Sequence, residues 1–124
     1  MSASTWIAFV VAAAIGAVLR YVVDGAIIDR TEGLYPWGTF VINVTGSLIL
    51  GVTTGLGLYH GLTTAPRLVV GTGFCGAYTT FSTFTFETVR LAEEGASANA
   101  VRNALGTLVA GGAAAALGLA IAAL

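Results

Sequence analysis

The chain has 124 residues, of which 56% are hydrophobic and 9% are charged, and its mean hydropathy is +0.90. This composition is too apolar for a soluble globular domain of this size, and it indicates a protein whose solvent is the lipid bilayer. The net charge of -1 offers no basic surface for nucleic acid, so no nucleic acid is expected as a partner.

Four stretches of the sequence are apolar enough to cross a membrane. A helix needs about 20 apolar residues to span about 30 Å of hydrocarbon. Arg20 is the only charged residue inside the four stretches, and the other charges gather in the short connections. We therefore expect an all-α integral membrane protein with four transmembrane helices in one domain over the whole chain. The predicted spans are residues 6–23, 37–59, 68–86 and 103–124.

The first span contains the run "VVAAAIGA", in which small residues follow an apolar core as they do in a secretory signal. No Lys or Arg precedes this span, whereas a signal peptide normally begins with a basic region. We expect a permanent helix, and a cleaved leader is the alternative.

The second and fourth spans each carry small and polar residues at intervals of three and four, which places them on one helix face. Such faces allow helices to approach closely in lipid, so we expect them to pack against other helices. Asn43 needs more than packing, because a carboxamide at bilayer depth is costly unless it faces a partner, a cavity or an ion. The stripes are Thr39, Asn43, Ser47, Gly51 and Thr54, and Asn103, Thr107, Gly111, Ala114 and Gly118.

The third span, "LVVGTGFCGAYTTFSTFTF", has the least regular composition. Gly71, Gly73 and Gly76 precede a run of hydroxyl and aromatic residues with poor helix propensity. We predict that this helix is interrupted near its middle, at about 76–79. Interrupted helices at membrane depth line polar cavities, and their freed carbonyl and amide groups bind ions.

The arginines are distributed unevenly between the connections. Arg20, Arg30, Arg90 and Arg102 lie at the first and third connections, against Arg67 at the second. By the positive-inside rule this bias places the first and third connections in the cytoplasm. When Arg20 and Arg102 are counted with the spans, the bias becomes weak, as in a protein that inserts in both orientations. Since four short helices enclose little space, we expect the functional site to lie between subunits.

Three local sequences agree with one family. "IGAVLRY" in the first span, "GTFVINVTGSLILG" in the second and "GTGFCGAYTTFSTF" in the third resemble, in this order, the Fluc fluoride channels, also called CrcB. The resemblance covers nearly the whole chain, and the third motif is the specific one. It implies a multi-pass protein of the prokaryotic plasma membrane that exports fluoride passively. It also implies an antiparallel dual-topology dimer, with itself or an oppositely oriented homologue, two fluoride pores and a central structural sodium ion.

The resemblance also assigns roles to individual positions. Asn43 resembles the pore-lining asparagine of the family, and Phe81 and Phe84 resemble its paired pore phenylalanines. Gly76 and Thr79 match the positions whose backbone carbonyls ligate the sodium ion.

Other matched positions surround this core. Arg20 matches the arginine of the first-span motif and is assigned to a vestibule, with snorkelling or pairing with Asp24 as alternatives. The fourth span departs from the family, because Asn103 stands where a tyrosine is common, and Thr107 takes the place of the hydroxyl residue that follows. Glu87 resembles the acid after the phenylalanines, and a surface pair with Arg90 is its alternative.

The chemistry of these residues suits fluoride. A pore must replace the tightly held water of this anion with strong donors, yet bind weakly enough to release it, which favours neutral donors. The rings of Phe81 and Phe84 can offer their positive edges. The other predicted donors are the carboxamides of Asn43 and Asn103 and the hydroxyls of Thr80, Ser82, Thr83 and Thr107.

Two other functions compete with a fluoride channel. A proton-coupled small multidrug exporter has a similar length and dual topology, but it needs a carboxylate within the membrane, and the four spans contain none. A non-transporting assembly subunit would leave the cluster of hydroxyl and aromatic residues without a purpose. No base and nucleophile pair, cofactor motif or metal-ligand cluster indicates an enzyme.

Overall fold

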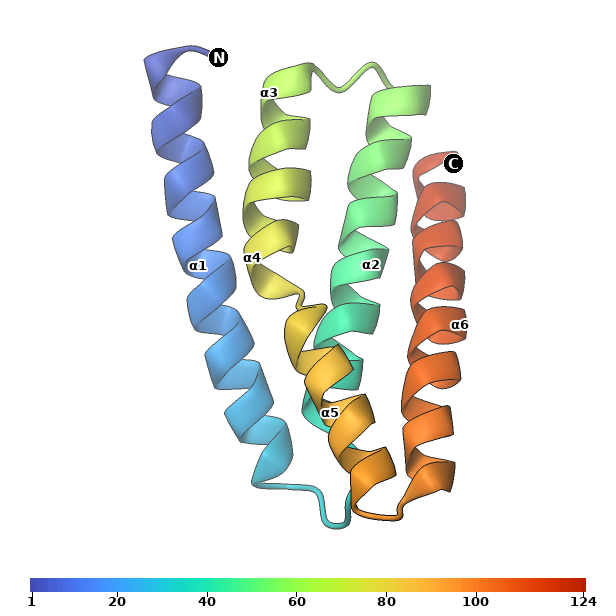
Figure 1. The fold of residues 1–124 in the computed structure, drawn as a ribbon. Coiled ribbons are helices and arrows are strands. Elements are labelled where there is room, and N and C mark those ends of the chain that lie inside the picture. The colour runs from blue at the N-terminus through green and yellow to red at the C-terminus, as the bar shows by residue number, and fades with distance from the viewer.

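The computed structural model covers residues 1–124 and is entirely helical. Four helical stretches lie side by side and run alternately down and up, so that both termini lie at the same end (Figure 1). The first is α1 (Ala3–Ile28), the second is α2 (Trp37–Tyr59) and the last is α6 (Ser97–Ala122). The third stretch lies between α1 and α2 in the view of Figure 1 and is built from several segments.

The third stretch changes its backbone conformation several times. Eight residues of it are π-helical, and Thr79 then turns to an extended conformation with ψ 164°. Below this point the chain resumes a helix in which the amide of Thr83 donates to the Thr80 hydroxyl (3.2 Å), as at a capped N-terminus. The segments are α3 (Thr64–Arg67), the π-helical η1 (Leu68–Cys75), α4 (Gly76–Tyr78) and α5 (Ser82–Glu93).

Three helices, α1, α2 and α6, are long and apolar enough to cross a membrane. The third stretch contains no single helix of that length, because the extended residue divides it. α1 extends beyond both ends of the predicted span 6–23, and α6 begins before the predicted residue 103. These extensions carry charged residues such as Arg102, because a helix continues its own hydrogen bonds beyond the hydrocarbon into the interface.

The helices α2 and α6 pack backbone to backbone through glycines. A Cβ added at Gly118 would lie 2.7 Å from the Val52 nitrogen, and one added at Gly51 would lie 3.0 Å from the Ala115 Cα. One turn away, Gly111 faces Ser47 in the same interface. The predicted small-residue faces of the second and fourth spans are therefore confirmed as a packing interface.

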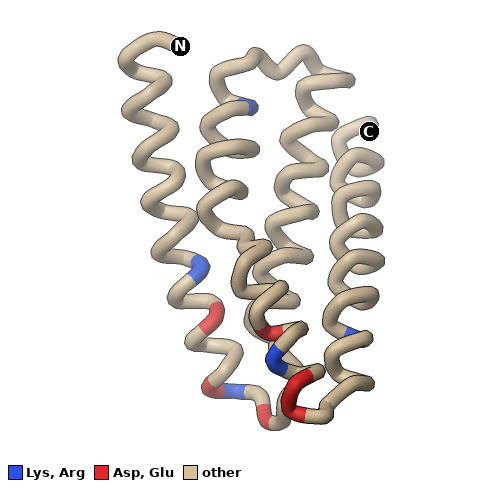
Figure 2. Tube along the Cα trace, viewed as in Figure 1, with Lys and Arg blue, Asp and Glu red and all other residues tan.

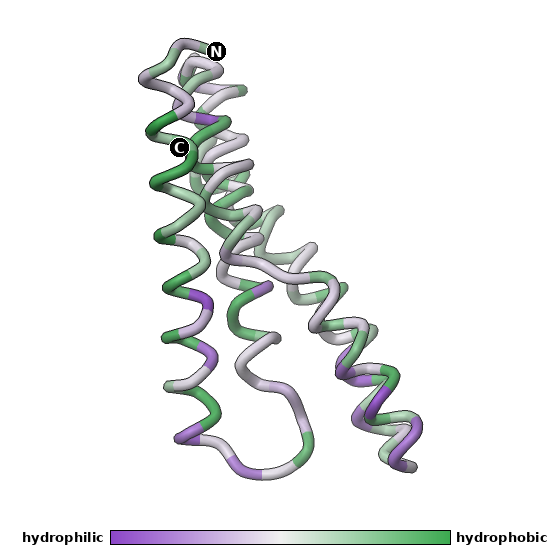
Figure 3. Tube along the Cα trace, turned by 60° about the vertical axis from the view of Figure 1, so that its left-hand side comes forward, coloured by the Kyte–Doolittle hydropathy of each residue, from purple (hydrophilic) through white to green (hydrophobic).

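The surface of the chain is apolar along most of its length. α1 packs against the third stretch through the buried Gly16, while side chains such as Ile7 and Val18 are exposed on its outer face. Figure 3 shows hydrophobic residues along the helices and the hydrophilic ones mainly toward one end. The charged residues are confined to that half of the molecule, apart from Arg67 at the opposite end (Figure 2). This apolar exterior with a charged end is the arrangement of a bilayer-embedded bundle.

Candidate functional site

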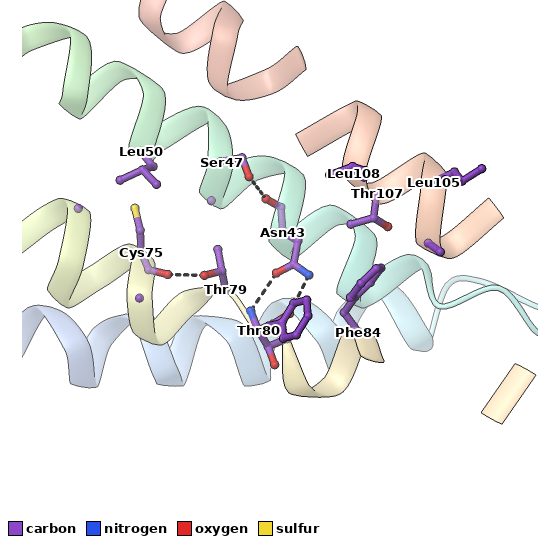
Figure 4. A pocket seen from close by; sticks show the side chains of 15 residues that line it. Asn43, Ser47, Leu50, Cys75, Thr79, Thr80, Phe84, Leu105, Thr107 and Leu108 are labelled. Atoms are coloured by element: carbon purple, nitrogen blue, oxygen red, sulfur yellow. Dashed lines mark hydrogen bonds between the residues drawn. The ribbon is translucent and has the colours of Figure 1, made fainter. Parts of the chain in front are cut away.

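An open cleft of about 640 Å³ lies where the third stretch meets α2 and α6. It brings together predicted residues from three parts of the sequence, with Asn43, Phe84 and Thr107 around one opening (Figure 4). Apolar and small residues such as Leu50 and Leu105 complete its walls. The predicted site residues that line the cleft are Asn43, Gly76, Thr79, Thr80, Phe81, Phe84 and Thr107.

Asn43 holds the divided segment of the third stretch to α2. Its side-chain NH₂ donates to the Thr80 carbonyl (2.9 Å), and its side-chain oxygen accepts from the Thr80 amide (2.9 Å). In a continuous helix the Thr80 amide would instead bond the carbonyl of Gly76, four residues earlier. Asn43 therefore takes the place of the missing helical partner, and it keeps one of its two amide hydrogens for the cleft.

Arg20 reaches the same segment from α1. Its guanidinium donates to the Thr79 carbonyl (3.1 Å), and Arg20 forms no ion pair with Asp24. The Thr79 hydroxyl donates to the Cys75 carbonyl (2.7 Å), which fixes the end of α4. The two carbonyls predicted to ligate a cation therefore differ. The Thr79 carbonyl accepts a hydrogen bond from Arg20, whereas the Gly76 carbonyl has lost the Thr80 amide that a continuous helix would supply.

The two phenylalanines form a pair beside this segment. The ring centroids of Phe81 and Phe84 are 5.9 Å apart and their planes meet at 39°. Phe81 is 78% exposed in the single chain, and Phe84 is partly buried. An aromatic ring presents a positive edge, so such a tilted pair can offer edges to an anion in the cleft.

The fourth-span residues occupy different depths. Thr107 lines the cleft, whereas Asn103 is completely buried between α5 and α6. The Thr107 hydroxyl donates to the Asn103 oxygen (3.4 Å), and the Asn103 NH₂ donates to the Thr88 hydroxyl (2.8 Å). Asn103 thus supports Thr107 from behind instead of lining the opening.

Arg20 and Thr83 line a separate cavity of about 280 Å³ on the other side of the divided segment. Thr80 borders both this cavity and the cleft, so the two spaces meet the same segment of the third stretch. Ser82 is exposed and lines neither space. An arginine in an open polar cavity of this kind can concentrate anions next to the cleft.

Tyr35 lies in the connection before α2, where no sequence pattern of the spans singles it out. Its hydroxyl lies 3.8 Å from where a Cβ of Gly106 in α6 would be. Burial raises the pKa of Tyr35 above its usual value of 10.0, and this effect outweighs the lowering by the nearby Thr107 side chain. The phenol therefore keeps its proton at neutral pH.

Glu87 lies in a small cavity of about 110 Å³ together with Asp24, Thr39 and Tyr35. One of its carboxylate oxygens is buried and has no hydrogen-bond partner. The alternative interpretation, a surface ion pair between Glu87 and Arg90, is wrong, because Arg90 forms its ion pair with Glu94 (3.4 Å).

Comparisons with known proteins agree with this architecture. The family model of the CrcB-like proteins, also described as camphor resistance (CrcB), matches residues 7–119. A protein of Streptomyces avermitilis named fluoride-specific ion channel FluC 1 is 46% identical over 86% of each chain. One of the same name from Frankia casuarinae is 46% identical over 94% of this chain and 95% of its own. FluC 2 of Mycolicibacterium paratuberculosis is 43% identical over 93% of this chain and 91% of its own.

The apolar helices, together with the cleft between them that holds a few polar side chains, define a multi-pass α-helical membrane protein. The chain belongs to the CrcB family, which confirms the resemblance predicted from the three motifs. Its relatives are bacterial and are named as ion channels, not as enzymes, and its place is the prokaryotic plasma membrane. A multidrug exporter is not favoured by these relatives.

Proposed function

We propose that this protein is a fluoride-selective channel that lets fluoride leave the cytoplasm passively. The observation that carries the proposal is the cleft, where neutral polar side chains and the rings of Phe81 and Phe84 converge in a chain whose relatives are named fluoride-specific ion channels. Strong neutral donors can replace the water of fluoride without holding the ion too tightly for it to leave.

The donors are arranged as such a path needs. Asn43, with one amide hydrogen that has no partner in the chain, lines the cleft together with the rings of Phe81 and Phe84 and the side chain of Thr107. The cleft contains no Asp or Glu to repel the anion, and the only nearby cation, Arg20, is directed to the Thr79 carbonyl from outside. Chloride, being larger and less strongly hydrated, gains less from these short contacts.

The path requires a second subunit. In the single chain the cleft is open, so the polar groups of Asn43 and Thr80 that line it would face lipid at membrane depth. Unpaired backbone groups are tolerated there only when protein or a water-filled cavity surrounds them. An antiparallel copy, or an oppositely oriented homologue, would cover the cleft and form two equivalent pores. In this arrangement the divided third stretch also crosses the membrane, as an interrupted span in addition to α1, α2 and α6.

A sodium ion at the dimer centre fits the donor chemistry of the segment. The carbonyl of Gly76 has lost its helical donor, and that of Thr79 keeps a lone pair beyond its bond to Arg20. Such oxygens are hard ligands of the kind that alkali ions prefer, and no cluster of side-chain ligands competes with them. When bound, the ion would neutralise facing carbonyl dipoles of the two copies.

Fluoride efflux from liposomes tests the proposal. The purified chain should release fluoride much faster than chloride under matched gradients, and protein-free liposomes are the control. Equal release of both anions, or release of neither from a preparation of folded dimer, would refute it. If the pure chain is silent and a co-expressed homologue restores efflux, the dimer is a heterodimer.

A further inference from the structure

A second cavity, of about 540 Å³, adjoins the cleft on the side of α3. The two spaces share Leu50, Gly71 and Gly76 as lining residues, and the second one extends between α2 and the third stretch as far as Thr64 at the start of α3. In Figure 1, α3 lies at the end of the molecule where both termini lie. The cavity therefore connects the proposed ion path with this end of the bundle.

The lining of this cavity is rich in hydroxyl groups and contains no Asp or Glu. Within the helices of this chain, threonine hydroxyls commonly donate to the carbonyl four residues earlier, as those of Thr45 and Thr53 do (2.7 and 2.8 Å). The hydroxyls of Thr54, Thr64 and Thr72, which also line the cavity, form no hydrogen bond within the chain. Their hydrogens are therefore available to a ligand in the cavity.

Arg67 is the only charged side chain in this half of the molecule, and it lines the same cavity (Figure 2). It has no acidic partner, since the one ion pair of the chain joins Arg90 to Glu94 at the opposite end. Its guanidinium also forms no hydrogen bond within the chain, unlike that of Arg20, which donates to a carbonyl. A positive charge without a partner beside free hydroxyls favours an anion as the ligand.

The guanidinium of Arg67 lies across the groove against α2. A Cβ added at Gly57 of α2 would lie 2.8 Å from the Arg67 Nη1 and 3.1 Å from its Nε. The absence of a side chain at Gly57 thus leaves the space that this guanidinium occupies. An arginine near a membrane surface can instead extend along its own helix into water. Here Arg67 bridges from the third stretch to α2, at the mouth of the cavity.

We propose that Arg67 and the free hydroxyls of Thr54, Thr64 and Thr72 form an anion-binding site that takes up fluoride at the second end of the ion path. The inference rests on the proposed channel function. A single charge at the mouth raises the local concentration of the anion, and the neutral hydroxyls deeper in the cavity can pass the ion on without trapping it. The phosphate of a lipid headgroup offers the same chemistry as a ligand, and the experiment below separates the two.

The variant Arg67→Gln tests the site, with Arg102→Gln as the matched control, because Arg102 is exposed on α6 and lines neither the cleft nor this cavity. In phosphatidylcholine liposomes at about 10 mM ionic strength, fluoride efflux should be about three- to tenfold slower in Arg67→Gln than in the control. Added sodium gluconate should reduce this difference to less than about twofold at about 0.5 M, because salt screens the charge. Arg67→Lys should keep most of the rate.

The variant Gly57→Ala separates the position of the guanidinium from its charge. The added methyl group should displace the Arg67 side chain from α2, so efflux at low ionic strength should fall as in Arg67→Gln. Thermal stability should equal or exceed that of wild type, because the displaced group is flexible and alanine is the better helix former. Gly112→Ala, whose Cβ would meet nothing within 4 Å, is the control and should match wild-type efflux.

The outcomes distinguish the site from the channel itself. Equal efflux in Arg67→Gln and Arg102→Gln at low ionic strength would overturn the inference and leave the channel function intact. If Arg67 binds a lipid phosphate instead, Arg67→Gln should lose only the thermal stabilisation that phosphatidylglycerol gives to the wild type, with unchanged efflux, and this result would also overturn the fluoride site. Wild-type liposomes that retain their fluoride would refute the channel function, and the inference with it.

Discussion

The role of Asn43 as the clamp of the divided segment leads to the sharpest prediction. The variant Asn43→Ala removes two hydrogen bonds of 2.9 Å to the backbone of Thr80. Each abandoned group in a partly buried position costs about 1–3 kcal/mol, so the loss of both partners should destabilise the native segment by about 2–6 kcal/mol. The lower end of this range applies if the Thr80 amide instead donates to the Gly76 carbonyl and so makes the helix continuous.

This loss should abolish conduction more than it destabilises the fold. Each 1.4 kcal/mol is about a factor of ten in an equilibrium constant, so the ratio of the native to an alternative arrangement of the segment should fall at least about 25-fold. Fluoride efflux should fall by up to this factor, beyond the effect of losing the free amide hydrogen. Because α1, α2 and α6 do not depend on Thr80 for their packing, the dimer should survive at moderate temperature.

The assay compares fluoride efflux from liposomes with thermal unfolding in detergent, for wild type, Asn43→Ala and Ser47→Ala. Ser47 lies one turn further along α2 and lines the same cleft, but its hydroxyl bonds only the carbonyl of Asn43 in its own helix (2.7 Å). Ser47→Ala should therefore stay close to wild type in both measurements. Wild-type efflux and wild-type stability in Asn43→Ala would refute the clamp.

Three further predictions concern packing, the arginine and the cation. Gly118→Ala should lower stability by about 1–3 kcal/mol, because its Cβ would meet the backbone of α2, whereas Gly112→Ala, which meets nothing within 4 Å, should be neutral or slightly stabilising in thermal unfolding. Arg20→Gln should slow fluoride efflux several-fold by weakening the bond to the Thr79 carbonyl and lowering the local anion concentration; an unchanged rate over a range of ionic strength would contradict that role. Replacing sodium by a large organic cation should reduce efflux or dimer content, and indifference of both would count against a sodium site.

Much of the fold follows from residue type and spacing. The small-residue stripes of the second and fourth spans predicted that these helices pack closely, as α2 does on α6. Only small residues let two helix backbones come as close as they do at Gly118. The cost of a carboxamide in the membrane likewise indicated that Asn43 has a partner and faces a cavity. Both predictions depend on local chemistry, which the sequence shows directly.

The contacts between distant elements could not be predicted in the same way. That Asn43 bonds the backbone of Thr80, and that Arg20 bonds Thr79, depends on the register of three helices. The register also decides that Asn103 is buried while Thr107 lines the cleft. The position of Tyr35 beside α6 could not be predicted, because Tyr35 lies outside every span. The aromatic residues close to it in sequence are the only sign that its ring is packed in a fixed position.

The reversal potential of the purified protein in a planar bilayer is the most direct test of selective passive fluoride conduction. With a fluoride gradient across the membrane and equal chloride on both sides, we expect a current that reverses at the equilibrium potential of fluoride. A current that reverses at the chloride equilibrium potential, or fluoride movement that requires a proton gradient, would contradict it.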